Sequence, residues 1–239
     1  MIGTLLNAAG ILVGGVVGLA WRKGLSPARE SMFKVLLGAF TVFYGLRLTW
    51  ISLNGSSLQI LKQLFIAMIA LMIGKLTGQL LRLQKLSNRI GQIARKRLAN
   101  IPEKPPSSGE GFKICTALFC AAPLGILGAV QDGLSGYYYP LGVKGVMEGL
   151  ATMGLVPLFG WGVMLAALPV LAFQGTITLG CEEFLKPILE AHGLTDSINA
   201  AGGLLVFSVA LVILDLKKIE LADYLPSLIF APLITWLWR

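Results

Sequence analysis

The sequence predicts an all-α protein, a polytopic transmembrane helical bundle of about eight spans, with seven as the alternative count. Composition is the first reason: of 239 residues, 55% are hydrophobic and 13% are charged, about half the charged share of a soluble domain. The mean hydropathy is +0.76. The second reason is that apolar residues gather in runs of about 20, the length at which a helix crosses a bilayer. The third is that basic residues lie between these runs, where they fix membrane orientation.

Eight apolar segments are the candidate spans. They are residues 2–21, 34–53, 58–81, 114–130, 137–158, 160–180, 198–214 and 225–238. The fourth, seventh and eighth are short, so one of them could be re-entrant or steeply inserted. Glycine and proline in "PLGILGAVQDGLSG" and "LPVLAFQG" predict helix breaks near 128–136 and 169–176.

The basic residues divide the chain and set its orientation. Residues 1–81 hold the first three spans, 82–113 form a basic loop and linker, and 114–239 hold the remaining spans, which carry the polar motifs. Three loops are basic, through Arg22, Lys23, Arg29, Lys34, Arg82, Lys85, Arg89, Arg95, Lys96, Arg97, Lys104, Lys113, Lys217 and Lys218. With eight spans these loops share one side of the inner (plasma) membrane, and the positive-inside bias makes that side cytoplasmic. The acidic stretch 181–196 and both termini then lie outside.

The 82–113 loop allows two interpretations. Residues 82–99 could form a short amphipathic helix that lies on anionic lipid, followed by the Pro/Ser/Gly linker "IPEKPPSSGEG". Alternatively, the loop is a solvated anchor whose basic residues only fix the topology.

Several function classes lack their sequence signatures. The net charge of +8 comes from residues between apolar runs, so it indicates membrane topology rather than nucleic-acid binding. Cys115, Cys120 and Cys181, with the single histidine His192, form no zinc or disulfide pattern. The chain has no G-x-S-x-G, H-E-x-x-H or G-x-x-x-x-G-K-[ST] motif. We therefore expect no enzymatic activity and no nucleic-acid partner, and the sequence assigns no cofactor and no metal.

Two charged residues lie deep inside a predicted span. Lys144 and Glu148 fall in segment 137–158, and Glu148 is about 16 Å from the outer start at Tyr137, close to the bilayer midplane. A charge at that depth costs roughly 2.5–3.5 kcal/mol on insertion scales. The i, i+4 spacing lets the two side chains neutralise each other as a structural pair. The functional alternative is an ion or proton site in which Glu148 binds and Lys144 is its counter-charge.

Further polar residues in or beside other spans are Asn7, Gln131, Asp132, Gln174 and Asn199. If these side chains point inward, they would line a polar vestibule that opens to the outside, with "QDGLSG" breaking the helix and presenting Asp132 to water. Irregular backbone at membrane depth is tolerated only where it is buried in protein or lines water. The alternative is that Gln131, Asp132 and Asn199 mark the interface, where polar side chains cost little.

Longer motifs resemble a known family. They are "GTLLNAAGILVGGVVGLAWRKGLS", "CAAPLGILGAVQDGLSG", "VKGVMEGL", "LPVLAFQGTITL", "AAGGLLV" and "KKIELADYLPSLIFAPL". Together they span nearly the whole chain and resemble the bacterial YqgA/YdfK-type integral membrane proteins, for which transport has been suggested. The resemblance places the family's motif residues at Asn7, Gln131, Asp132, Gly133, Lys144, Glu148, Gln174 and Gly203. Glu148 stands where an aspartate is more usual, and Asp196 with Asn199 replaces a glutamate-led segment.

The sequence thus predicts a secondary transporter or channel-like binder of a small ion or polar solute. The ligand-binding residues would be Asn7, Gln131, Asp132, Lys144, Glu148, Gln174 and Asn199. The second interpretation is a non-transporting membrane scaffold or sensor whose basic loop 82–113 is the partner surface. Besides the solute, the lipid bilayer is an expected partner, and a homo-oligomer stays open. The substrate is not specified by the sequence.

Cysteine labelling tests the predicted orientation. A cysteine introduced at Ser107 should react with a membrane-impermeant maleimide only after the membrane is permeabilised, because the 82–113 loop is predicted to be cytoplasmic. A cysteine introduced at Ala191 should react in intact cells. The opposite pattern would overturn the orientation, and mixed accessibility would favour seven spans.

Overall fold

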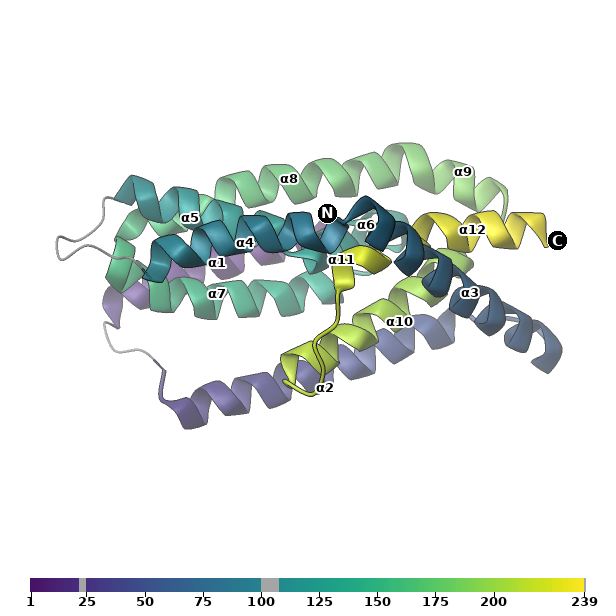
Figure 1. The fold of residues 1–239 in the computed structure, drawn as a ribbon, viewed down its shortest axis with the longest axis horizontal. Coiled ribbons are helices and arrows are strands. Elements are labelled where there is room, and N and C mark those ends of the chain that lie inside the picture. The colour runs from purple at the N-terminus through teal and green to yellow at the C-terminus, as the bar shows by residue number, and fades with distance from the viewer. Residues whose placement is uncertain (22–24, 100–107, 239) are drawn as a thin grey trace.

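The described part of the chain forms helices and no strands (Figure 1). The computed structural model describes residues 1–21, 25–99 and 108–238. The longer helices are α1 (Ile2–Ala20), α2 (Pro27–Ile51), α3 (Ser57–Leu81), α4 (Leu83–Ala99), α5 (Ser108–Ala121), α6 (Pro123–Ser135), α7 (Tyr139–Phe159), α8 (Ala167–Gly180), α10 (Thr195–Ile213) and α12 (Ser227–Leu237). The shorter ones are the 3-10 helix η1 (Trp161–Ala166), the π-helix η2 (Cys181–Leu185), α9 (Lys186–Ala191) and α11 (Leu221–Tyr224).

Six helical stretches are long and apolar enough to cross a membrane. They are Ile2–Ala20, Pro27–Ile51, Ser57–Leu81, Tyr139–Phe159, Trp161–Ala191 and Thr195–Ile213. The bent pair of α5 and α6 makes a seventh crossing if it counts as one span, and the last apolar stretch, Leu221–Leu237, is shorter. The predicted all-α polytopic bundle is therefore confirmed in the described residues, with six or seven crossings by length.

The predicted span 114–130 is two helices, α5 and α6, which are bent by 61° relative to each other. The bend lies at Ala122 and Pro123. A residue before proline is driven out of the helical region, and Ala122 has the extended angles φ −69° and ψ 119°. α5 begins earlier than predicted, at Ser108, so the two half-helices together are long enough to cross the bundle.

The two predicted helix breaks have different outcomes. The predicted break at 169–176 is wrong, because α8 is continuous from Ala167 to Gly180. Pro169 lies in the first turn of α8, directly after the 3-10 helix η1, so its missing N–H removes no hydrogen bond of a regular α-helix. The irregular backbone instead flanks α8, as η1 before it and η2 after it. The break at 128–136 is confirmed only at its end, since α6 stays helical through Ser135 and stops at Gly136, whose φ of +65° favours glycine.

Most of segment 82–113 is helical rather than a loop. α4 has a half-buried stripe at Leu83, Gln84, Ser87 and Ile90, the spacing of an amphipathic helix. This stripe packs on α5, and the Ser87 hydroxyl donates to the Ala121 carbonyl at 2.9 Å. α4 is thus docked on the bundle over its first turns. Residues 100–107 of the predicted linker, like Arg22 and Lys23, lie outside the described residues.

Helices α1 and α7 pack in parallel through small residues. Gly10 of α1 faces Gly145 of α7 and Gly14 faces Gly149, so the two helices run in the same direction. A Cβ at Gly14 would overlap the Gly149 carbonyl, which is the close approach that small residues allow between membrane helices. A Cβ at Gly145 would lie 3.0 Å from the Asn7 Cα. The same packing therefore brings Asn7 beside the charged residues of α7.

Helices α2 and α10 form a second close pair, which runs antiparallel. The Thr49 hydroxyl, near the end of α2, donates to the Ala200 carbonyl in the first turns of α10 at 3.3 Å. Gly38, earlier in α2, faces Leu214, which directly follows α10. α3 packs against α11 and α12 and also contacts α10, so these five helices form one unit.

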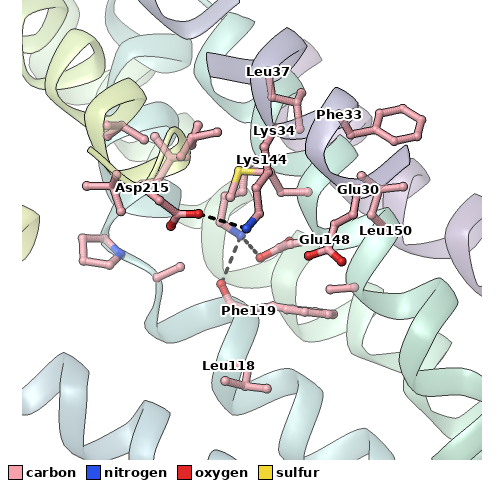
Figure 2. Close-up of a pocket in the computed structure, with 18 of the residues that line it drawn as sticks. Glu30, Phe33, Lys34, Leu37, Leu118, Phe119, Lys144, Glu148, Leu150 and Asp215 are labelled. Carbon is pink, nitrogen blue, oxygen red and sulfur yellow. Dashed lines mark hydrogen bonds and ion pairs between the residues drawn. The ribbon is translucent and has the colours of Figure 1, made fainter. Parts of the chain in front are cut away.

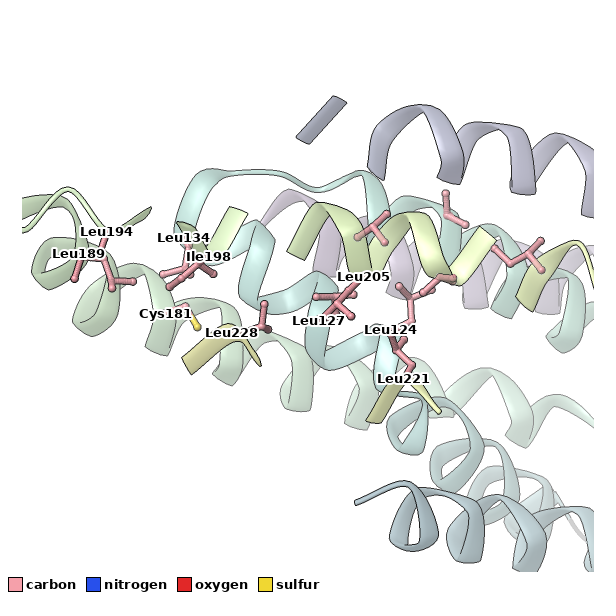
Figure 3. Close-up of a cluster of buried hydrophobic side chains, with 14 residues drawn as sticks. Leu124, Leu127, Leu134, Cys181, Leu189, Leu194, Ile198, Leu205, Leu221 and Leu228 are labelled. Atoms are coloured by element: carbon pink, nitrogen blue, oxygen red, sulfur yellow. The ribbon is translucent and has the colours of Figure 1, made fainter. Parts of the chain in front are cut away.

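The molecule therefore has two groups of helices. The first group is α1 with α5 to α8, and the second is α2 and α3 with α10 to α12 (Figure 1). They meet where α6 packs on α10, in a cluster of buried apolar side chains (Figure 3). Its labelled members are Leu124, Leu127, Leu134, Cys181, Leu189, Leu194, Ile198, Leu205, Leu221 and Leu228. The α6 half of the broken span is thus held between the two groups.

A glycine-to-alanine pair tests the α1–α7 contact. Gly14→Ala should lower the free energy of unfolding by about 1–3 kcal/mol, because the added methyl forces two helix backbones apart. Gly142→Ala, in α7 with no atom within 4 Å of an added Cβ, should leave stability unchanged or slightly higher. Thermal unfolding of both purified variants measures the difference. Equal losses would contradict the proposed packing.

Candidate functional site

The ion pair of Lys144 and Glu148 is buried in the interior of the bundle. The two residues are only 2% and 6% exposed, and the Lys144 ammonium is paired with the Glu148 carboxylate Oε1. The ammonium also donates to the Phe119 carbonyl at 3.1 Å. The predicted pairing is confirmed, and the backbone of α5 supplies a further partner that the sequence analysis did not anticipate.

Pro123 explains why the Phe119 carbonyl needs an outside donor. In a continuous helix this carbonyl would accept the N–H of the residue four positions later, but that residue is Pro123, which has none. Lys144 supplies the missing donor. Its positive charge also lies at the C-terminal end of α5, where the helix dipole favours a cation. The break in the span and the lysine therefore stabilise each other.

Asn7 and Gln174 complete a polar cluster around the ion pair. The Asn7 amide donates to Gln174 Oε1 at 2.9 Å, and Asn7 lies next to the Glu148 carboxyl. A Cβ at Gly125 would lie 3.0 Å from Gln174 Nε2 and 3.7 Å from Lys144 Nζ. Side chains from α1, α7 and α8 thus converge beside the first turn of α6.

The cluster is not fully hydrogen-bonded. Among the described residues, no partner reaches Asn7 Oδ1, Gln174 Nε2, Glu148 Oε2 or the hydroxyl of Thr152, which lies one turn beyond Glu148 on α7. Buried polar atoms are nearly always paired with protein, water or a ligand. Thr152 was missed by sequence reasoning, although its i, i+4 spacing from Glu148 could have identified it.

Asp132 has a different role from the one predicted. It is 3% exposed, and its Oδ2 accepts the backbone N–H groups of Gly3 at 3.0 Å and Thr4 at 3.4 Å. The same oxygen is 3.3 Å from the Met1 ammonium. Asp132 therefore caps the N-terminus of α1, where a carboxylate is favoured. Seven residues separate it from Gly125 along α6, about 10 Å of helix rise, so it does not join the cluster around Glu148.

Gln131 and Asn199 lie at the contact between α6 and α10. Gln131 is fully buried with its amide against Gly202. The Ser135 hydroxyl donates to Asn199 Oδ1 at 3.2 Å. Of the seven predicted site residues, the structure brings together Asn7, Lys144, Glu148 and Gln174. Asp132 and Asn199 instead bond α6 to α1 and to α10. Gln131 lies against Gly202, and neither of its amide atoms has a hydrogen-bond partner among the described residues.

A cavity of about 1000 Å³ leads to the ion pair (Figure 2). Lys144 and Glu148 line its buried end together with Phe119 and Pro123, while Lys34 and Asp215 line its exposed end. Lys34 and Asp215 are paired at 3.0 Å. The cavity lies between the two helix groups, with walls from α2, α7 and α10.

The opening differs from the predicted outward-facing vestibule. Lys34, near the start of α2, and Asp215, just after α10, lie at the end of the bundle that the basic loops predict to be cytoplasmic. The polar residues nearer the other end, Gln131, Asp132 and Asn199, are buried at contacts between helices and do not line this cavity.

A tyrosine cluster joins the two helix groups at the opposite end. The Tyr137 hydroxyl donates to the Tyr44 carbonyl at 2.6 Å, and the rings of Tyr44 and Tyr139 stack with centroids 3.8 Å apart. Sequence reasoning missed this cluster, although three consecutive tyrosines after "QDGLSG" were a visible signal.

The described residues contain no group of three or more His, Cys, Asp and Glu side chains that could hold a metal ion. Cys115, Cys120 and Cys181 are free thiols. The chemistry that this site offers is therefore that of its carboxylate, ammonium, amides and hydroxyl, which can bind and release a polar group or a proton.

Paired substitutions test the energetic role of the ion pair. Glu148→Gln should lower the free energy of unfolding by about 3–5 kcal/mol, because it leaves the Lys144 charge buried and uncompensated. The double variant Lys144→Met with Glu148→Gln should recover much of this loss. Glu190→Gln is the matched control, since Glu190 pairs with Lys186 at the same i, i+4 spacing but on the surface, and should change little. A stable Glu148→Gln variant would show that the pair is not a structural requirement.

Comparison with known proteins supplies the family. The model of the family described as "Protein of unknown function (DUF554)" matches residues 2–236. The chain is 31% identical over 238 residues to "Uncharacterized membrane protein YdfK" of Bacillus subtilis, covering 98% of this chain and 95% of that protein. It is 27% identical over 240 residues to "Uncharacterized protein YqgA" of Escherichia coli, covering 100% and 97%. No solved structure matches. The chain is a multi-pass membrane protein with several apolar helices, and it belongs to the DUF554 family.

Proposed function

We propose that this protein is a secondary transporter that binds a small ion or polar solute at Glu148 and Lys144. One observation carries the proposal: a buried ion pair with unpartnered polar atoms around it lies at a helix break and lines a large cavity. Ionisable groups inside membrane helices usually mark a substrate or ion pathway. No catalytic role is proposed for these residues.

The broken span supports transport more than a static role. Secondary transporters commonly build the substrate site from discontinuous helices whose ends meet near the bilayer midplane. Here the end of α5 and the start of α6 meet beside Lys144, and the cavity reaches both Phe119 and Pro123. A substrate held there would contact backbone as well as side chains.

The two helix groups supply the parts of an alternating-access mechanism. The cavity between them extends to the exposed Lys34 and Asp215 at one end, while Tyr44 and Tyr137 join the groups at the other. Rocking of the first group against the second would close the first end and separate the tyrosines. The proposal includes an inner-membrane location with this mouth toward the cytoplasm. Both termini then lie outside, with the bent pair of α5 and α6 as the seventh crossing and the shorter stretch Leu221–Leu237 as the eighth.

The alternative function is a scaffold or sensor with a basic partner surface. Its supporting observation is that Arg82, Lys85, Arg89 and Lys96 are exposed on or beside α4, away from the face that packs on α5. Such a face would suit an anionic lipid surface or an acidic partner. A scaffold or sensor requires no cavity and no buried ion pair, so a measurement of solute flux separates the two functions.

Flux into proteoliposomes tests transport. Protein-containing vesicles should show at least one flux absent from empty vesicles, among protons reported by an entrapped pH dye, sodium, and radiolabelled amino acids, polyamines and dicarboxylates. Glu148→Gln should reduce that flux at least about tenfold, as loss of a charge-assisted bond predicts. Glu190→Gln, a surface carboxylate outside the cavity, should leave it intact. Folded protein that carries none of these species would favour the scaffold or sensor.

A further inference from the structure

The walls of the cavity are mostly apolar. They include Phe33 and Leu37 of α2, Met147 and Ala151 of α7, and Val209 of α10. A desolvated inorganic cation needs several oxygen ligands that converge on it. These apolar side chains supply none, and the acidic side chains lie apart, with Glu148 at the buried end and Asp215 at the exposed end. A volume of about 1000 Å³ instead suits an organic molecule, which pockets of this kind hold by apolar contact and a few polar groups.

The charges that line the cavity leave a negative excess. Two basic residues, Lys34 and Lys144, face three acidic ones, Glu30, Glu148 and Asp215. The pairs of Lys34 with Asp215 and of Lys144 with Glu148 account for four of these charges. One acidic charge is left over. The side chains that line the cavity therefore carry one more negative than positive charge, which favours a cation over an anion against these walls.

The polar atoms at the buried end also favour a hydrogen-bond donor as ligand. Lys144 donates two of its three N–H groups, to the Phe119 carbonyl and to Glu148 Oε1, whereas Glu148 Oε2 has no partner among the described residues. Gln174 Nε2, the unpartnered amide donor of the cluster, is not among the residues that line the cavity. An ionised carboxylate oxygen can only accept. At the nearby start of α6, Pro123 has no N–H, and the Gly125 N–H is bonded to the Ala122 carbonyl at 2.9 Å.

We propose that the substrate is an organic ammonium ion with an apolar body. Its N–H group would donate to the Glu148 carboxylate, which lines the buried end of the cavity, and its body would lie along Phe33, Leu37, Met147 and Val209. This inference rests on the proposed function and adds the chemical class of the ligand. Specificity would come from the charged head and affinity from the apolar walls.

Three probes with one apolar body and different heads test the class. Phenylpropylammonium, phenylpropionate and phenylpropanol are titrated against the protein in phosphatidylcholine nanodiscs, with empty nanodiscs as the blank for partitioning. The ammonium probe should bind at least about tenfold more tightly than the alcohol, because its bond to the carboxylate is charge-assisted. The carboxylate probe should bind more weakly than both.

Variants assign the binding to this cavity. Glu148→Gln should remove the preference for the ammonium over the alcohol, and Glu148→Asp should restore part of it. If Glu148→Gln does not fold, the double variant with Lys144→Met carries the same test. Ala151→Trp, which fills the cavity, should weaken all binding, whereas Ala191→Trp, exposed and outside the cavity, should not.

The outcomes separate this inference from the function on which it rests. Tighter binding of phenylpropionate, lost on Lys144→Met, would overturn the ammonium class and keep a solute site. Stabilisation by sodium or potassium chloride without binding of any organic probe would also overturn it and favour an inorganic ion. If neither the probes nor these salts bind the folded protein, both the class and the solute site fall.

Discussion

The hydrogen bond from Lys144 to the Phe119 carbonyl is the interaction on which the centre of this molecule depends. Pro123 removes the N–H that would bond this carbonyl, and it drives Ala122 out of the helical region, so α5 and α6 meet at a bend of 61°. Lys144 satisfies the freed acceptor, but a buried ammonium needs a counter-charge, which Glu148 provides. The helix break, the lysine and the glutamate are thus one unit, and removing any of them leaves another buried group without its partner.

Small residues place this unit where other helices can reach it. The glycines of α1 and α7 let the two backbones approach closely, and Asn7 thereby lies beside Glu148 and bonds to Gln174 of α8. Asp132 of α6 bonds to the N-terminus of α1. The position of Asn7 along the bundle is therefore set by this cap before it and by the glycine contacts with α7 after it. The cluster is built from three separate helices, yet its register is tightly constrained.

The division into two helix groups connects the site to the surface. Within each group the contacts are close, as between α1 and α7 or α2 and α10, whereas the groups meet at α6 and at the tyrosine cluster. The cavity lies between the two groups, with walls from α2, α7 and α10, and the ion pair lines its buried end. In the proposed transport, this cavity would be the binding site that faces one end of the bundle, and the tyrosine contact would separate at the other end, as access from alternating sides requires.

The sequence by itself determined the class, the helical content and the Lys144–Glu148 pair, because these follow from local properties: apolar run length, residue type and i, i+4 spacing. It also indicated Asn7 and Gln174 as polar residues inside spans. Only the tertiary structure decided that Asp132 caps α1, that Gln131 and Asn199 lie between α6 and α10, that Pro169 breaks nothing, and that the cavity opens toward Lys34 and Asp215. The contacts of Asp132 and Asn199 depend on which helix each side chain meets. These partners lie 129 and 64 positions apart in the sequence, and no local pattern encodes such a contact.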